Sequence, residues 1–301
     1  MDFNKKEMPI QGFAGFGGGA TGSAFRSAAA DDDYGVEFDG SNDWLQVADS
    51  ADYSFSSDDY TVEFWVYPEG TINDKGYVCK WKTDGNLEWF VGTNSAILVL
   101  GYSTNGNGYT VPTSGHTMQS GSWQHIAVAR SGNNVKFFVD GVQRGSTHDD
   151  SGATYYNGTD PVVIGANEHG GSSWRMDGKI SNVRITKGQA LYTSNFTVPS
   201  SPLTTTSQSA TASNVKLLCC NESTVTGSTK TATTISVGGG SPDSVSGPFA
   251  TLAGSNYSID LDGNDSITVP NGSGAIDIAD NDFTLECFFR ASTSGSPGTH
   301  D

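Results

Sequence analysis

Acidic and amide side chains gather in two expected loops of the chain. Asp39, Asn42 and Asp43 follow one apolar run, and Asn167 and Asp177 flank the stretch between two others. Calcium takes about six to eight oxygen ligands and accepts carboxylates together with Asn and backbone carbonyls. These five residues are therefore candidate calcium ligands. The alternative is that the Asp and Asn side chains only cap turns, as they commonly do.

Aromatic residues near expected loops and strand ends offer a second kind of chemistry. The apolar faces of pyranose rings stack on accessible aromatic rings, while polar side chains bind the sugar hydroxyls. The candidate rings are Trp81, Trp89, Tyr109 and Trp174. The alternative is that aromatic side chains fill the protein core, which is how we interpret Trp65 and Trp123.

The stretch 167–177 is the main candidate for a sugar site. It places Glu168, His169, Trp174 and Asp177 between two expected strands. An aromatic ring, two carboxylates and an imidazole within one loop can both stack on a sugar and bind its hydroxyls.

Catalytic patterns are not found in the sequence. Retaining glycoside hydrolysis needs two carboxyl groups about 5 Å apart, which alternate positions of one strand can supply. Glu63 instead alternates with Trp65 and Tyr67, and no Gly-x-Ser-x-Gly elbow is present. We therefore expect a binding or structural protein and not an enzyme.

Composition narrows the class of protein and its partners. The chain has 38 Gly among 301 residues, 16% charged residues and a formal net charge of −17. Such a negative charge repels nucleic acid. No apolar run approaches the ~20 residues of a membrane span, and the N-terminus lacks the pattern of a secretion signal. We expect no nucleic-acid partner and no membrane insertion.

The four cysteines do not suggest a disulfide framework or a zinc site. They show no Cys-x-x-Cys spacing, and the neighbouring pair Cys219 and Cys220 would point to opposite faces of a strand. We expect buried free thiols at Cys79, Cys219, Cys220 and Cys287.

Short alternating apolar runs separated by turn residues predict strands throughout the chain. The clearest is 60–67, in which Val62, Phe64 and Val66 share one face. Two runs around the turn 131–134 predict a hairpin. The expected strands are 36–40, 44–47, 60–67, 77–81, 87–92, 97–102, 123–130, 135–141, 162–165 and 178–185. This pattern predicts an all-β sandwich of two antiparallel sheets.

The first 33 residues differ from the rest, because they are Gly-rich and carry spaced Phe residues. Such a segment cannot bury enough apolar surface to fold by itself. Two interpretations stay open: a disordered leader, or an attachment arm whose Phe13, Phe16 and Phe25 dock on a neighbouring subunit.

An internal repeat divides the remainder of the chain. Residues 34–40 are echoed by 257–263, and 60–65 by 283–288, at one and the same offset. The second copy stops at residue 301, before its own hairpin, so we expect the chain to be a piece of a longer protein. The predicted organisation is an arm at 1–33, a jelly roll at 34–206, and a linker with an incomplete second repeat at 207–301. Two alternatives stay open for residues 207–256, which either pair with the first sandwich or begin the second.

The order of these motifs resembles the LamG-like, concanavalin A-like jelly-roll family over about residues 34–200. The motifs are TVEFWVY at 61–67, SWQHIAVAR at 122–130, NVKFFVDG at 134–141 and GKISNVRI at 178–185. KGQALYTSNFTVP at 187–199 and the Gly-rich leader are similar to segments of marine bacteriophage structural proteins. VKLLCC at 215–220 resembles the strand that opens a next unit in such proteins.

The resemblance implies a sandwich used for recognition, often of sugars and sometimes with calcium. It also implies a virion component such as a tail fibre, spike or capsid decoration, with virion proteins and a host-surface glycan as partners and a homo-oligomeric state. Two alternatives remain: a carbohydrate-binding module of a cellular surface protein or enzyme, and a degraded glucanase.

Overall fold

The computed structural model describes residues 33–82, 85–167, 174–230 and 234–249. They fall in the first of two units of the chain, residues 1–255. Three groups of predictions lie outside the described residues: those for Phe13, Phe16 and Phe25, those for Glu168 and His169, and those for Cys287 and the second repeat. Among the described residues, no helix has the length and apolarity needed to cross a bilayer.

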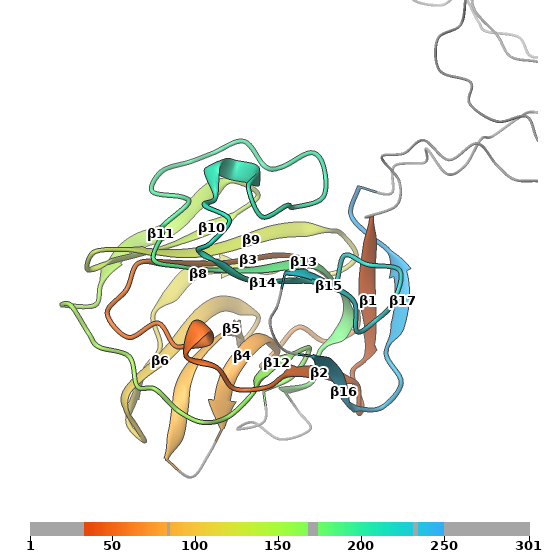
Figure 1. Ribbon diagram of the computed structural model, residues 1–301, viewed down its shortest axis with the longest axis horizontal. Coiled ribbons are helices and arrows are strands. Elements are labelled where there is room, and N and C mark those ends of the chain that lie inside the picture. Colours follow the sequence, from red (N-terminus) through yellow and green to blue (C-terminus); the bar gives the residue numbers. More distant parts are fainter. Residues whose placement is uncertain (1–32, 83–84, 168–173, 231–233, 250–301) are drawn as a thin grey trace, which may run out of the picture. The chain divides into compact units, whose positions relative to one another are not determined.

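Two antiparallel sheets face each other across the described part of the chain (Figure 1). Sheet A has nine strands there, in the order β11-β10-β9-β3-β13-β1-β17, and β14 and β15 continue from the second half of β13. Its strands are β1 (Tyr34–Asp39), β3 (Tyr60–Pro68), β9 (Gln124–Ser131), β10 (Asn134–Val139), β11 (Val142–Asp149), β13 (Asp177–Lys187), β14 (Val215–Cys219), β15 (Ser228–Lys230) and β17 (Asp243–Ser246).

Sheet B has eight strands in the same described ranges, in the order β16-β2-β12-β4-β5-β6-β7, with β8 also paired to β6. Its strands are β2 (Trp44–Val47), β4 (Gly76–Lys82), β5 (Asn86–Asn94), β6 (Ile97–Gly106), β7 (Tyr109–Thr110), β8 (Thr113–Thr117), β12 (Val162–Ile164) and β16 (Ile235–Gly239). The predicted sandwich of two antiparallel sheets is confirmed.

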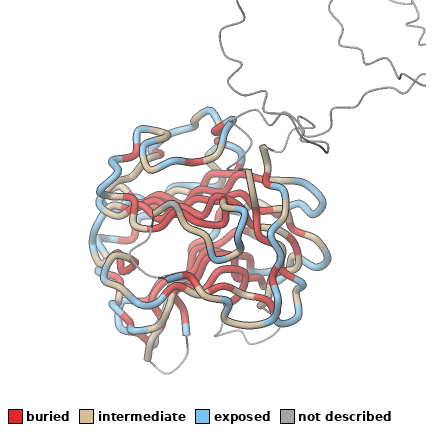
Figure 2. The backbone as a smooth tube through the Cα atoms, turned by 45° about the vertical axis from the view of Figure 1, so that its right-hand side comes forward, coloured by how far each residue is buried: buried red, intermediate tan, exposed pale blue. Residues whose placement is uncertain are grey.

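The main core lies between the two sheets, and it draws on alternate positions of strands from both. Val62, Phe64 and Val66 of β3 are all fully buried in it, as their spacing predicted. From sheet B, Trp89 and Val91 of β5 enter the same core. Figure 2 shows buried backbone concentrated along both sheets.

The outer face of sheet A is also buried, because residues 188–214 cross it; we call them the covering segment (Figures 1 and 2). The N–H of Leu191 donates to Thr61 Oγ1 at 2.9 Å. The N–H of Leu203 donates to Asn182 Oδ1 at 2.8 Å, and Leu203 packs in one cluster with Trp65. Trp65 is therefore buried as expected, but on the face opposite the main core.

The sheets continue past residue 206, where the sequence analysis ended the jelly roll. β14 pairs with β13, β16 pairs with β2, and β17 pairs with β1. The predicted boundary is therefore wrong, and β14, β15, β16 and β17 are part of this sandwich and not of a linker. The physical reason is that these strands pair with backbone groups that β13, β2 and β1 would otherwise leave exposed on one side.

The cysteine prediction needs one correction. Cys79, Cys219 and Cys220 are buried free thiols, as expected, and burial raises the pKa of the Cys79 thiol. Cys219 and Cys220 do not, however, point to opposite faces. Cys220 follows the end of β14 with a φ of 57°, and the two Sγ atoms lie 3.8 Å apart in the main core. The turn after the strand overrides the alternation.

Candidate functional site

Four aromatic side chains adjoin one another on the outer face of sheet B. The ring centroid of Trp81 on β4 is 5.0 Å from that of Phe90 on β5 and 5.5 Å from that of Tyr109 on β7. Phe90 in turn lies 5.9 Å from Trp174, which precedes β13. All three contacts are edge-to-face, an arrangement that aromatic quadrupoles favour. We call these four residues the aromatic face.

The local sequence explains why Phe90 lies outside the main core. Its neighbours Trp89 and Val91 point into that core, so Phe90 points to the opposite side of the sheet. Phe90 is in register with Gly101 of β6, and a Cβ on Gly101 would lie 2.0 Å from the Phe90 ring. The missing side chain of Gly101 therefore makes room for the ring to lie across β6.

The four rings differ in exposure. Trp81 and Phe90 are 3% and 4% exposed, whereas Tyr109 is 57% exposed and Trp174 is half-buried. The buried pair therefore forms a floor that contacts the two more exposed rings. A ring held on a strand loses little conformational freedom when a ligand stacks on it.

Three of the residues singled out for sugar binding come together here. Trp81, Tyr109 and Trp174 are linked through Phe90, which the sequence analysis did not single out. Its position opposite a glycine was the available signal, and it could be used only once the strand register was known. Two other described candidates lie elsewhere. Trp89 is fully buried in the main core, because it points to the side of β5 opposite Phe90, so its prediction as a sugar-stacking ring is wrong. Asp177 lies in an acidic cleft.

The acidic cleft has a volume of about 360 Å³ and lies where β1 meets β13 and the turn between β16 and β17. Asp39 and Asp177 are directly opposite each other in the β1–β13 register. Residues that line the cleft include Glu37, Asp39, Asn42, Asp43, Asp177 and Asp243. The structure thus brings together four of the five candidate calcium ligands.

Backbone N–H groups donate hydrogen bonds to the carboxylates of this turn. Asp39 Oδ1 accepts hydrogen bonds from the N–H groups of Ser41 at 2.8 Å and Asn42 at 3.0 Å. Hydrogen bonds from the Asn42 and Ser41 amides hold the pKa of Asp39 below its usual value. Asp43 accepts from the N–H of Asp39 at 3.1 Å and from that of Ser241 at 2.6 Å. This is the turn-capping role that was the alternative to calcium.

The fifth candidate ligand, Asn167, does not line the acidic cleft and is only 2% exposed. Within the described ranges, no three His, Cys, Asp or Glu side chains are grouped as a metal ion would require. Calcium binding stays a prediction.

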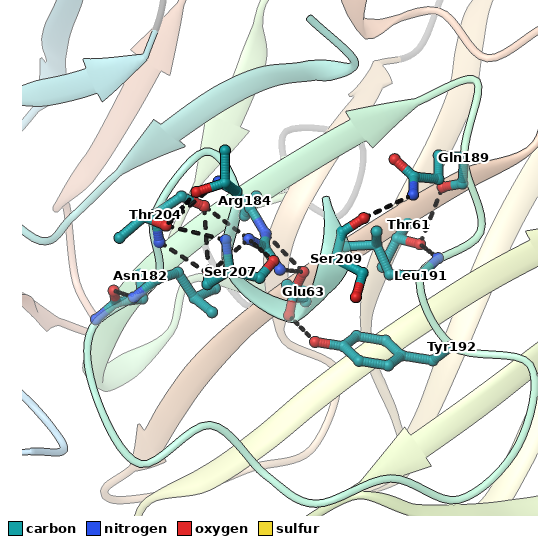
Figure 3. Close-up of polar contacts among 12 residues, drawn as sticks. Thr61, Glu63, Asn182, Arg184, Gln189, Leu191, Tyr192, Thr204, Ser207 and Ser209 are labelled. Carbon is teal, nitrogen blue, oxygen red and sulfur yellow. Dashed lines mark hydrogen bonds and ion pairs between the residues drawn. The ribbon is translucent and has the colours of Figure 1, made fainter. Parts of the chain in front are cut away.

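A buried ion cluster lies beneath the covering segment (Figure 3). Arg184 Nε and Nη2 lie 2.8 and 2.7 Å from Glu63 Oε1. The Tyr192 hydroxyl donates to Glu63 Oε2 at 2.7 Å, and His125 Nε2 is 3.4 Å from the same atom. Glu63 and Arg184 are fully buried.

Two opposing effects act on the Glu63 carboxyl. Burial alone would raise its pKa, but Arg184, His125 and Tyr192 together hold the pKa below its usual value. An ionised, fully buried carboxylate can neither donate a proton to a leaving group nor reach a sugar. Glu63 is therefore one half of a structural ion pair with Arg184.

The fold and the aromatic face define a sandwich of the lectin type, and a family comparison agrees. The Laminin G family model described as "Concanavalin A-like lectin/glucanases superfamily" matches residues 39–192. The chain belongs to this superfamily, so its fold is of a kind associated with carbohydrate binding. A search among curated proteins returned no significant match.

Solved structures with a similar chain path have low sequence identity. The heptameric SAP-like pentraxin of Limulus polyphemus is 17% identical, with a TM-score of 0.47 over 73% of this chain and 98% of its own. A putative carbohydrate binding protein from Bacteroides ovatus is 14% identical, with a TM-score of 0.49 over 72% and 60%. Domain 4 of an extracellular arabinanase from Geobacillus stearothermophilus is 18% identical, with a TM-score of 0.40 over 52% and 71%. The fold assignment rests on the family match and the sheet topology.

Proposed function

We propose that this chain is a non-enzymatic carbohydrate-binding protein whose site is the aromatic face. The observation that carries the proposal is the placement of Tyr109 and Trp174 over a buried floor of Trp81 and Phe90. A sugar ring presents C–H groups on its faces and hydroxyls at its edges. Aromatic rings held in place can stack on those faces, and nearby polar groups can bind the hydroxyls.

Two glutamates on the strands of the sandwich are held in structural contacts inside the protein. Glu63 is locked to Arg184 inside the protein. Glu88 is equally buried, where its carboxylate is bonded to the Lys80 ammonium and accepts from the Gly158 N–H at 2.9 Å. Glycoside hydrolysis needs a carboxylic acid and a carboxylate that both reach the substrate. Neither of these glutamates can serve as one of that pair.

Within this class, we propose that the chain is a phage virion component, such as a tail fibre, spike or decoration. The support is the resemblance of residues 187–199, together with the Gly-rich leader, to marine bacteriophage structural proteins. Most of the stretch 187–199 lies in the covering segment on sheet A, away from the aromatic face. The sandwich would then bind a host-surface glycan, and neighbouring virion proteins or further copies of the chain would be the protein partners.

Binding of the full chain to a glycan array, followed by calorimetry on any ligand found, tests the carbohydrate role. Tyr109→Ala and Trp174→Ala should each abolish or greatly weaken binding. Val142→Ala removes a side chain that is 42% exposed on β11 of sheet A, and it should leave binding intact. Unchanged affinity in both aromatic variants, or an array without any ligand, would refute the proposed site. Repeating the assay with a chelator tests the calcium prediction.

Mass spectrometry of purified particles tests the virion role. Peptides of this chain should be present in phage particles from lysates of the host that carries the gene. Peptides found only in the envelope of uninfected cells would support the alternative, a carbohydrate-binding module of a cellular surface protein.

A further inference from the structure

Several strands around the aromatic face come from a stretch of sequence without charged residues. Residues 89–129 contain no Asp, Glu, Lys or Arg, in a chain where 16% of residues are charged. This stretch supplies most of β5, all of β6, β7 and β8, and the first part of β9. β6, β7 and β8 therefore contribute no acidic side chain to sheet B.

Strand register places hydroxyl side chains on the same face as the aromatic rings. Thr113 of β8 lies opposite Val99, which packs with Trp81 and Phe90. Residues directly opposite each other in an antiparallel pair share a face, so Thr113 lies beside the rings. Ile97 lies two positions before Val99 on β6. Thr117 is opposite Ile97, so by the same rule it lies on the same face as Thr113.

Further uncharged polar residues precede Tyr109. Asn105 at the end of β6 and Asn107 in the turn before β7 are both exposed. Amides and hydroxyls both donate and accept hydrogen bonds, as sugar hydroxyls do. This surface therefore matches a neutral, hydroxyl-bearing ligand in both its apolar and its polar parts.

Charged residues on the neighbouring strands are mostly unavailable to a ligand. Lys80 precedes Trp81, and Glu88 precedes Trp89, but both side chains are fully buried and bonded to each other. Lys82, exposed at the end of β4, is the cation that follows Trp81 in sequence. It provides a direct test of whether a positive charge takes part in recognition.

Resting on the proposed function, we infer that the ligand of the aromatic face is an uncharged glycan, without uronate, sulfate or phosphate groups. An anionic sugar would lose part of its hydration against a surface rich in hydroxyls and amides, and it would approach a chain of net charge −17. A neutral sugar incurs neither cost.

The test is affinity electrophoresis of the full chain in gels that contain matched polysaccharides. The pairs are hydroxyethyl cellulose with carboxymethyl cellulose, dextran with dextran sulfate, and agarose with carrageenan. A neutral polymer should retard the protein, and its anionic partner should bind about tenfold more weakly or not at all. Raising the salt concentration should change the affinity by less than about twofold, because no ion pair is formed.

Lys82→Ala separates the possible outcomes. It should leave retardation by the neutral polymer unchanged, while Tyr109→Ala abolishes it. Preference for an anionic polymer that weakens steeply with salt, or that is lost in Lys82→Ala, would overturn the neutral-ligand inference and leave sugar binding intact. If neither these polymers nor the glycan array yields a ligand, the proposed function fails and this inference fails with it.

Discussion

The two outer faces of this sandwich have opposite chemistry. On sheet A, the covering segment closes over Glu63 and Arg184, which are fully buried. On sheet B, Tyr109 is 57% exposed on a floor formed by Trp81 and Phe90. A polar, charged face is thus a packing surface where a segment covers it, whereas an aromatic face that is left partly uncovered stays accessible to a ligand.

The energetics of the two faces differ for the same reason. Burying two charges costs hydration free energy, and their mutual attraction offsets this cost only while both are present. The ion cluster is therefore sensitive to the loss of one partner. The exposed ring of Tyr109 has lost little hydration, so its removal costs the fold little. We therefore expect changes on sheet A to alter stability and changes on sheet B to alter binding.

The largest effect on stability is expected for Glu63→Ala. It leaves the Arg184 guanidinium buried without its carboxylate, which should lower the free energy of unfolding by about 3–5 kcal/mol. Chemical denaturation measures this loss. The double variant Glu63→Leu, Arg184→Met should be less destabilised than the single one, and an equal or greater loss would argue against an ion pair as the cause.

The same cluster should set part of the pH dependence of stability. The pKa of Glu63 is lowered in the folded protein, because Arg184, His125 and Tyr192 outweigh the effect of burial. A lowered pKa means that its contribution is fully present above the unfolded-state pKa and is lost as the pH falls through the folded-state pKa. Denaturation at several acidic pH values should therefore show a shallower decline in Glu63→Gln, and identical slopes would contradict this assignment.

An intermediate effect is expected for Gly101→Ala on sheet B. The new Cβ would lie 2.0 Å from the Phe90 ring, so the ring must move. Overpacking of this kind costs about 1–3 kcal/mol, and it should also weaken glycan binding by displacing the floor of the aromatic face. Gly108→Ala is the matched control, since its Cβ would meet nothing closer than 3.7 Å. Loss of stability without loss of binding would show that the floor is not needed for binding.

A smaller effect is expected for Gln189→Ala in the covering segment. Gln189 donates to the Ser209 carbonyl and accepts from the Thr211 N–H, both at 2.9 Å. Losing these bonds near the surface should cost about 1 kcal/mol, measured by thermal unfolding. Gln143→Ala, which loses only contacts of 3.4 Å, should be neutral. Equal costs for both variants would mean that Gln189 does not hold the segment.

The smallest effect on stability is expected for Tyr109→Ala. Its ring is 57% exposed, so the free energy of unfolding should change by no more than about 0.5 kcal/mol. Glycan binding, by contrast, should be lost. If the variant both unfolds and loses binding, the expectation that changes on sheet B alter binding without altering stability is wrong.

Much of the fold could be predicted from local patterns. Alternation placed Val62, Phe64 and Val66 in the main core, and turn residues separated the strands. The boundary at residue 206 was wrong, because β14, β16 and β17 are short and pair only with distant strands. Cys220 was misplaced because a turn after a strand changes which face a residue occupies.

The amino-acid sequence by itself determined the sandwich class, the aromatic candidates and the charge-free stretch 89–129, since periodicity and composition are local properties. Only the tertiary structure decided that Trp81, Tyr109 and Trp174 meet through Phe90, and that Glu63 is closed off by Arg184. Both depend on strand register and on the path of the covering segment. These are set by contacts between residues far apart in the chain, which no local pattern encodes.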